Sequence, residues 1–171
     1  MTAFCPCPDL KGLHAYCFRI SHQADAIALI TELDAYQAAL YPPESHHALD
    51  LGSVPAQRLL FVIARDDAGC AVGCGAVVLS AAYGKLKRMY VRPRARGAGM
   101  AKNILQTLEA AALASGCPLL KLESGPSQPE ALALYARRGY QRCGPFGTYT
   151  DDPLSVFMQK TLAANAVSST A

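Results

Sequence analysis

The stretch from Lys85 to Leu105, KLKRMYVRPRARGAGMAKNIL, constrains the fold of this chain more than any other part of its sequence. Alternating apolar side chains predict a strand that ends at Val91, and a long helical pattern follows a turn that contains Gly97 and Gly99. A helix that opens directly after such a turn directs several unpaired N–H groups, and the positive end of its dipole, at one place. The turn is therefore a candidate anion site, and phosphate is the usual anion at such a site.

Glycine suits this turn because a ligand can approach bare backbone there, and because Gly97 and Gly99 can adopt positive φ without a steric cost. Basic side chains gather around the same turn, at Lys85, Lys87, Arg88, Arg92, Arg94, Arg96 and Lys102. The net charge of the whole chain is only +3, so this local charge favours a polyphosphate ligand over a nucleic-acid duplex. A solvated basic face is the alternative interpretation of these residues.

Two other phosphate-binding loops compete with this interpretation. A Walker loop needs Gly-Lys-Ser/Thr, which the stretch lacks. A dinucleotide-binding fingerprint is closer, because Glu123 lies about twenty residues further on, at the end of a strand. Lys102 occupies the position where that fingerprint needs a small residue, and too little chain follows to complete the remaining βαβ units.

The other elements follow from apolar periodicity and from Gly and Pro breaks. Strands are expected at 13–20, 58–65, 71–79, 85–91, 119–123, 140–143 and 155–162, and helices at 22–41, within 43–50, at 97–115 and at 129–138. This order predicts an α/β domain with a mixed, mostly antiparallel central sheet of about six or seven strands and helices on both faces. We expect the domain to span residues 13–162, between a leader (1–12) and a disordered tail (163–171).

Composition narrows the class of protein. The chain has 171 residues, of which 51% are hydrophobic and 17% charged, values typical of one soluble globular domain. We find no apolar run that could span a bilayer and no signal peptide. Seven irregularly spaced cysteines favour reduced thiols in the cytoplasm over a disulfide framework, and we expect no metal, nucleic-acid or membrane ligand. The oligomeric state stays open, a homodimer included.

Two motifs resemble the GNAT superfamily of N-acetyltransferases. The segment Val91 to Ala101, with its Val-x-Pro and Arg-x-x-Gly-x-Ala spacing, is similar to the family's acetyl-CoA pyrophosphate loop. The segment Leu134 to Tyr140, with a tyrosine shortly before a Gly-aromatic turn, resembles the family's catalytic helix. Their joint occurrence is far more specific than either alone, and the resemblance covers roughly residues 13–162. It implies the GNAT fold, with a splay between the fourth and fifth strands.

The resemblance also implies acetyl-CoA as the cosubstrate. Its pantetheine arm would pair with the backbone of the splayed strand in place of a missing strand. The N–H groups from Arg96 to Ala101 would hold the pyrophosphate, and Asn103 would reach the same ligand from the first helical turn. The implied cosubstrate-binding residues are thus Met89, Tyr90, Val91, Arg96, Gly97, Ala98, Gly99, Met100, Ala101 and Asn103.

Tyr135 resembles the family's general acid, which protonates the departing CoA thiolate. The base stays open. Glu123 is the first candidate, acting directly or through water, although it could instead simply bind a cationic acceptor; His46 or His47 is the second candidate. The glutamate that some family members carry on the strand before the loop is absent here. We expect His46, His47 and Tyr149 to line the acceptor site. With Asp151 and Asp152 nearby, a small cationic molecule or a peptide N-terminus would suit that site.

The predicted activity is an acetyl-CoA-dependent transfer of an acetyl group to the amine of a small molecule or peptide, made directly in a ternary complex. A covalent route through Cys117 or Cys143 is an alternative, although no His neighbour is evident for either thiol. A non-catalytic acyl-CoA-binding or regulatory domain on the same scaffold is the other alternative, because a fold alone does not establish a function.

Overall fold

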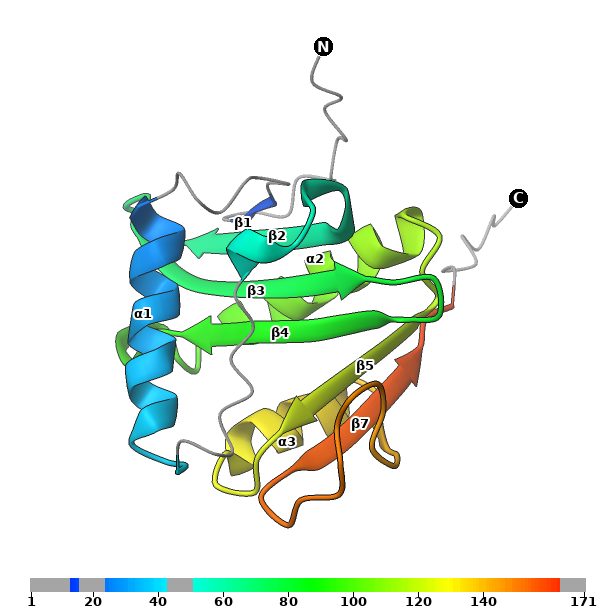
Figure 1. The fold of residues 1–171 in the computed structure, drawn as a ribbon. Helices are drawn as coiled ribbons and strands as arrows, with labels where there is room; N and C mark the ends of the chain where they lie inside the picture. Colours follow the sequence, from blue (N-terminus) through cyan, green and yellow to red (C-terminus); the bar gives the residue numbers. More distant parts are fainter. Residues whose placement is uncertain (1–12, 16–23, 43–50, 164–171) are drawn as a thin grey trace, which may run out of the picture.

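The computed structural model describes residues 13–15, 24–42 and 51–163, and these form one seven-stranded sheet in the order β1-β2-β3-β4-β5-β7-β6 (Figure 1). The strands are β1 (Leu13–Ala15), β2 (Leu59–Arg65), β3 (Ala71–Leu79), β4 (Gly84–Val91), β5 (Leu119–Ser124), β6 (Gln141–Arg142) and β7 (Val156–Thr161). The helices are α1 (Ala24–Ala38), α2 (Met100–Ala114) and α3 (Pro129–Arg137). Within this described sheet β4 and β5 are parallel and the other neighbours are antiparallel, which confirms the predicted mixed sheet.

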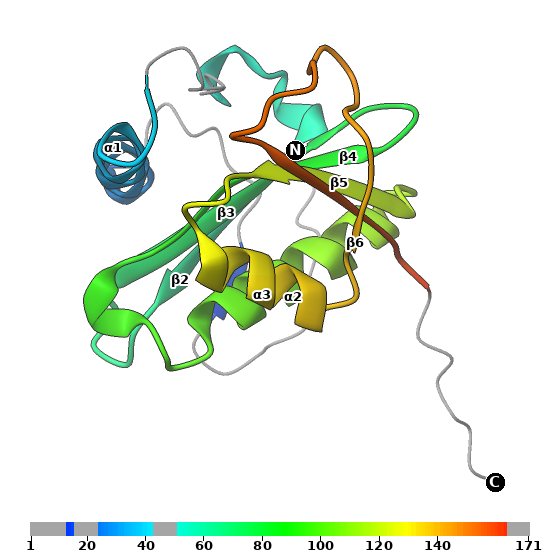
Figure 2. The same cartoon turned by 90° about the horizontal axis from the view of Figure 1, so that it is seen from below.

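The helices cover both faces of the sheet, as predicted, with α1 on one face and α2 and α3 on the other (Figure 2). Helix α2 packs through Ile104, Leu105 and Leu108, which are completely buried against the sheet. Each such side chain contributes roughly 1.5–3 kcal/mol when it leaves water. Helix α1 covers the opposite face with a narrower stripe that includes Leu29 and Leu33. The sheet therefore separates two cores, and β4 borders both of them.

The splay between β4 and β5 is the feature of the sheet that matters most for function. Residues Gly84 to Leu86 pair with Leu120 to Leu122, and no pairing between these two strands follows. Within the described sheet, the residues from Met89 to Val91 therefore have no strand partner on their β5 side. The splay lies between the fourth and fifth strands, where we predicted it.

A β-bulge in β4 accompanies the splay. The register between β3 and β4 shifts at Gly75, and Arg88 has a φ of 59°, unusual for a residue other than glycine. The backbone of β3 lies very close to this bulge, because a Cβ added to Gly75 would lie 2.6 Å from the sulfur of Met89 and 2.7 Å from Ile104. The small residues of β3 thus accommodate the bulge and helix α2.

Some element boundaries differ from the prediction. We placed the start of the second long helix at Gly97, but α2 begins at Met100, because Gly97 and Gly99 adopt left-handed φ values of 81° and 79°. Arg58 belongs to a 3-10 turn (Ala56–Arg58) and not to β2. The leader, the helix expected within 43–50 and the tail beyond residue 163 lie outside the described residues. Among the helices that are described, none has the length and apolarity to cross a membrane.

Candidate active site

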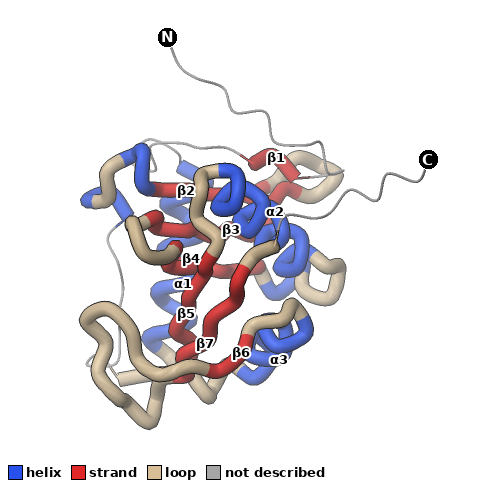
Figure 3. The backbone as a smooth tube through the Cα atoms, turned by 90° about the vertical axis from the view of Figure 1, so that its right-hand side faces the viewer, coloured by secondary structure: helices blue, strands red, loops and turns tan. Residues whose placement is uncertain are grey.

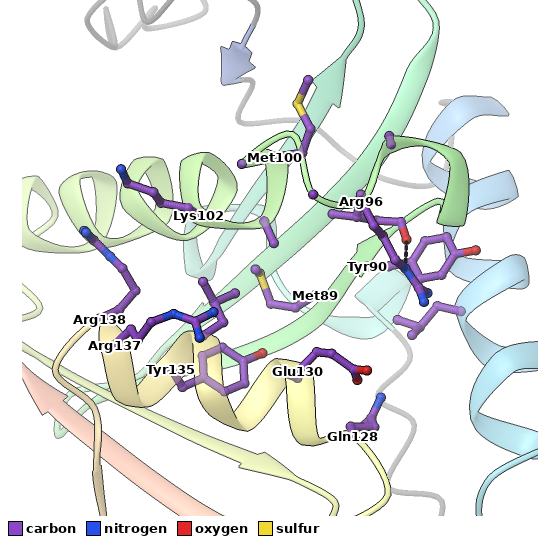
Figure 4. Close-up of a pocket in the computed structure, with 18 of the residues that line it drawn as sticks. Met89, Tyr90, Arg96, Met100, Lys102, Gln128, Glu130, Tyr135, Arg137 and Arg138 are labelled. Atoms are coloured by element: carbon purple, nitrogen blue, oxygen red, sulfur yellow. Dashed lines mark hydrogen bonds between the residues drawn. The ribbon is translucent and has the colours of Figure 1, made fainter.

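A cavity of about 690 Å³ opens where β4 leaves β5. Its walls are the end of β4, the turn before α2 and one side of α3, and Leu33 and Tyr36 of α1 close one end (Figure 4). Most of the predicted cosubstrate-binding residues line it, namely Met89, Tyr90, Val91, Arg96, Gly97, Gly99, Met100 and Ala101. Ala98 and Asn103, which we also predicted, are not among the lining residues.

The turn before α2 presents bare backbone to this cavity. No heavy atom lies within 4 Å of the position that a Cβ would take on Gly97 or on Gly99. The first helical hydrogen bond recorded here runs from the N–H of Asn103 to the carbonyl of Gly99. In this described part of the chain, the structure records no acceptor for the N–H groups of residues 97–102. These groups are available to an anionic ligand at the positive end of α2.

Basic side chains surround the same turn. Arg96 is held in place because its Nε donates to the carbonyl oxygen of Val91 at 3.1 Å, and its Cζ lies 5.4 Å from the centre of the Tyr36 ring. Lys102 lines the cavity from the first turn of α2, and Arg137 and Arg138 line it from the end of α3 (Figure 4). The cavity wall is therefore electropositive around the turn, which favours a polyphosphate ligand.

Tyr135 lies on α3 and lines the cavity opposite Met89 (Figure 4). The residue is 6% exposed, and no hydrogen bond of its hydroxyl to another described residue is recorded. Burial raises the pKa of this phenol well above its ordinary value of 10, so the O–H keeps its proton at neutral pH. A protonated donor inside a cavity can serve as a general acid.

Glu123 lies at the fork of the splay and does not line the cavity. One carboxylate oxygen, Oε1, accepts a hydrogen bond from the Ser155 hydroxyl at 3.0 Å, and the other, Oε2, lies 3.6 Å from the Nζ of Lys87. Lys87 and Glu123 would be the next register pair after Leu86 and Leu122, so their ion pair bridges the point where β4 and β5 diverge. Glu123 therefore lies on the α1 face of the sheet, because alternate strand residues face opposite sides.

Tyr149 lies on the same face, in the loop between β6 and β7, which is drawn in tan in Figure 3. Its ring centre is 5.5 Å from that of Phe157 and 4.1 Å from the Nζ of Lys85. The backbone N–H of Leu154 donates to the carboxylate of Asp152 at 2.8 Å, so Asp152 helps to shape this loop. His46 and His47, the other predicted acceptor-site residues, lie outside the described residues.

Helix α1 is fixed to the sheet beside the cavity by ion pairs. Glu32 accepts three hydrogen bonds from Arg92, the shortest at 2.6 Å, and Asp34 pairs with Arg88 at the bulge. The hydrogen bonds from Arg92 hold the pKa of Glu32 below its ordinary value, so the pair stays charged. These contacts position Leu33, which lies between the two acidic residues and lines the cavity.

Several lining residues were not predicted from the sequence, among them Tyr36 of α1, Glu130 and Arg137 of α3, and Arg138 at the end of that helix. The two arginines end a helix that carries Tyr135, and the spacing of Arg138 from Tyr135 is a signal that we could have used. No sequence signal indicates that Tyr36 of α1 lines the cavity, because only the packing of α1 on β4 brings it there. Neither Cys117 nor Cys143 lines the cavity, and burial raises the pKa of the Cys143 thiol.

These features define a class of site. A helix N-terminus with open backbone N–H groups, a strand edge without a partner in the described sheet and a protonated tyrosine share one cavity, an arrangement suited to transferring a group from a nucleotide-containing cosubstrate. Comparison with known proteins gives the family. The acetyltransferase (GNAT) domain matches residues 57–142, about half of the chain.

A protein of Azospirillum brasilense named IAA acetyltransferase is 44% identical over 142 residues, which cover 82% of this chain and 92% of that protein. A crystal structure from Klebsiella pneumoniae, assigned as an acyl-CoA N-acyltransferase, is 41% identical with a TM-score of 0.78, over 88% of this chain and 97% of that one. The PaiA N-acetyltransferase of Thermoplasma acidophilum, solved with coenzyme A, is 16% identical and shares the fold, with a TM-score of 0.67 over 88% of this chain and 99% of that one.

The chain belongs to the GNAT family of acetyltransferases. The resemblance noted in its sequence is thereby confirmed, and so is its class as an acyltransferase. The alternative of a non-catalytic domain is set aside.

Proposed function

We propose that this protein transfers the acetyl group of acetyl-CoA directly to the amine of an acceptor bound in the splay between β4 and β5. The observation that carries the proposal is the presence of the glycine turn and the buried Tyr135 hydroxyl in one cavity. The open turn at Gly97 and Gly99 supports the assignment of the pyrophosphate to residues 96–101. Neighbours of this fold have been solved with coenzyme A or acetyl-CoA bound.

The unpaired edge of β4 is the proposed place of the pantetheine arm. Residues from Met89 to Val91 have no strand partner on the β5 side within the described sheet, and an amide-bearing arm can supply the missing hydrogen bonds. Met89, Tyr90 and Val91 line the cavity along this edge. The thioester would then lie inside the splay, between the cavity on the α2 side and the residues on the α1 side.

In the proposed reaction the neutral amine nitrogen attacks the thioester carbonyl carbon, a C–N bond forms and the C–S bond breaks. Tyr135 gives its proton to the departing thiolate, which leaves as CoA. The ammonium group of the acceptor molecule must lose a proton to a base. We propose that Glu123 takes this proton, directly or through water. Its position at the fork of the splay supports this role, although its carboxylate is also engaged by Lys87 and Ser155.

A direct transfer needs no nucleophilic side chain. The sulfur of Cys117 lies 3.4 Å from the carbonyl oxygen of Leu119, a contact that fits a structural thiol, and Cys143 is away from the cavity. We therefore favour the ternary complex over a covalent acetyl-cysteine.

The test is a CoA-release assay over a panel of primary amines, made with the wild type and with Tyr135→Phe. We expect kcat to fall by on the order of a hundredfold while the affinity for acetyl-CoA is retained, because only the O–H is removed. Tyr140→Phe is the matched control, since its buried ring is centred 5.7 Å from that of Tyr135 but does not line the cavity. If Tyr135→Phe kept the wild-type kcat, with chemistry shown to be rate-limiting, Tyr135 would have only a packing role.

A further inference from the structure

Three lysines gather on the α1 face of the sheet at the fork of the splay, outside the cavity described above. Lys85 and Lys121 are direct register partners on β4 and β5, and Lys87 is two residues beyond Lys85 on the same face. Two aromatic residues of the β6–β7 loop, Phe146 and Tyr149, lie against their ammonium groups. We refer to these five residues as the lysine–aromatic cluster.

The contacts within the cluster are close. The Nζ of Lys85 is 4.1 Å from the centre of the Tyr149 ring, and that of Lys87 is 5.2 Å from the same ring. The Nζ of Lys121 lies 5.4 Å from the centre of the Phe146 ring. Cation–π contacts of this kind hold the ammonium groups in place but do not neutralise their charge.

Among the described residues, the cluster has an excess of positive charge, because the one ion pair recorded to its three lysines joins Glu123 to Lys87. Among the described residues, no ion pair to Lys85 or Lys121 is recorded, although like charges directly opposite each other on neighbouring strands are unfavourable. Burial lowers the pKa of Lys85, and burial together with the charge of Lys85 lowers that of Lys87 to about 8. An added anion would relieve this excess of positive charge.

The cluster lies where an acceptor would enter. The proposed cosubstrate fills the splay from the side of α2 and α3, which leaves the α1 face to the acceptor. Lys85 is four residues before Met89, about 13 Å along the strand. An extended molecule with an amine at one end and an anionic group at the other can bridge that distance.

We propose that the acceptor is an amino carboxylate, whose amine meets the thioester and whose carboxylate binds at Lys85 and Lys121 beside Tyr149. This inference rests on the proposed function and names its substrate class. It replaces our expectation of a cationic acceptor, because Asp152 is used within its own loop and the lysines dominate the fork. The carboxylate supplies the charge that the cluster lacks.

The test compares extended amino carboxylic acids, with the amine and the carboxylate at opposite ends, with their carboxamides and with a polyamine as acceptors. The wild type should favour the carboxylates in kcat/KM. Lys85→Met should lower kcat/KM for the carboxylates by about tenfold, leave that for the carboxamides within about twofold, and leave the KM for acetyl-CoA unchanged. Lys85→Arg should restore most of the preference. Arg142→Met, which removes an exposed positive charge from β6, is the matched control and should change neither ratio.

A second measurement does not depend on turnover. By calorimetry in the presence of CoA, an N-acetylated extended amino carboxylic acid should bind the wild type more tightly than its amide, and Lys85→Met should lose this difference. A preference for uncharged amines or the polyamine, or equal effects of Lys85→Met on both members of each pair, would overturn the inference. An enzyme that releases CoA with none of the amines would instead refute the proposed function, and the calorimetric comparison would then decide on the anion site by itself.

Discussion

The two sides of β4 differ in how far apart in the sequence their residues lie. On the side of α2, the wall of the cavity from Met89 to Ala101 is one continuous run, with α3 facing it. On the side of α1, the lysine–aromatic cluster combines β4, β5 and the distant loop from 143 to 155. The first wall offers the open backbone N–H groups of a helix N-terminus beside basic side chains, whereas the second offers side chains alone.

This difference separates the part of the site suited to a common cosubstrate from the part suited to a particular acceptor. Backbone groups at a helix N-terminus recognise any phosphate in the right place, and this suits a cosubstrate shared by a whole family. Side chains on neighbouring strands can change without altering the fold, and this suits a wall that selects the acceptor. Mutations on the two sides should accordingly affect different kinetic constants.

The largest expected effect is on the α2 side. Gly99→Glu places a side chain and a negative charge where the pyrophosphate is proposed to bind, at a φ of 79°. Like-charge contacts cost several kcal/mol, so the affinity for CoA should fall at least about a hundredfold in calorimetry. Gly116→Glu at the other end of α2 is the matched control, since its φ is 76° and nothing lies within 4 Å of its Cβ position. An unchanged CoA affinity in Gly99→Glu would refute the phosphate assignment.

The second effect concerns the α1 side. If Glu123 takes the proton of the acceptor, Glu123→Gln should lower kcat by about a hundredfold and flatten the acidic limb of the pH–rate profile, with the affinity for CoA retained. The loss in kcat should be smaller for acceptors whose amine has a low pKa. A change confined to the acceptor KM, with the acidic limb intact, would instead assign Glu123 to binding of the acceptor.

The smallest effect is on stability. Burial lowers the pKa of Lys87 from 10.5 to about 8, so between these values the unfolded chain binds more protons than the folded one, and stability rises with pH. Relative to Lys87→Met, the wild type should gain about 1 kcal/mol in free energy of unfolding between about pH 7 and 9, measured by urea denaturation. If the free energies of unfolding of the wild type and Lys87→Met changed with pH in the same way, Lys87 would not be an unfavourable buried charge on the α1 side.

Much of the fold was predictable because its signals are local. The apolar stripe of α2, the alternation in β4 and the turn glycines all act within a few residues. The exact start of α2 was not predicted, since nothing in the pattern separates a left-handed Gly97 from the first turn of a helix. The bulge at Arg88 was also missed, and only the small residues of β3 hinted at it.

The sequence by itself determined the family, the glycine turn before α2 and the place of Tyr135, because each depends on backbone conformation and spacing inside one segment. The tertiary structure alone decided what shares the site with them. It brought Tyr36 of α1 to the cavity, engaged Glu123 with Lys87 and Ser155, and set Lys85 beside Lys121 under Tyr149. Those contacts depend on the register of β4 against β5 and on where the last loop folds back, and neither is encoded in the spacing of neighbouring residues.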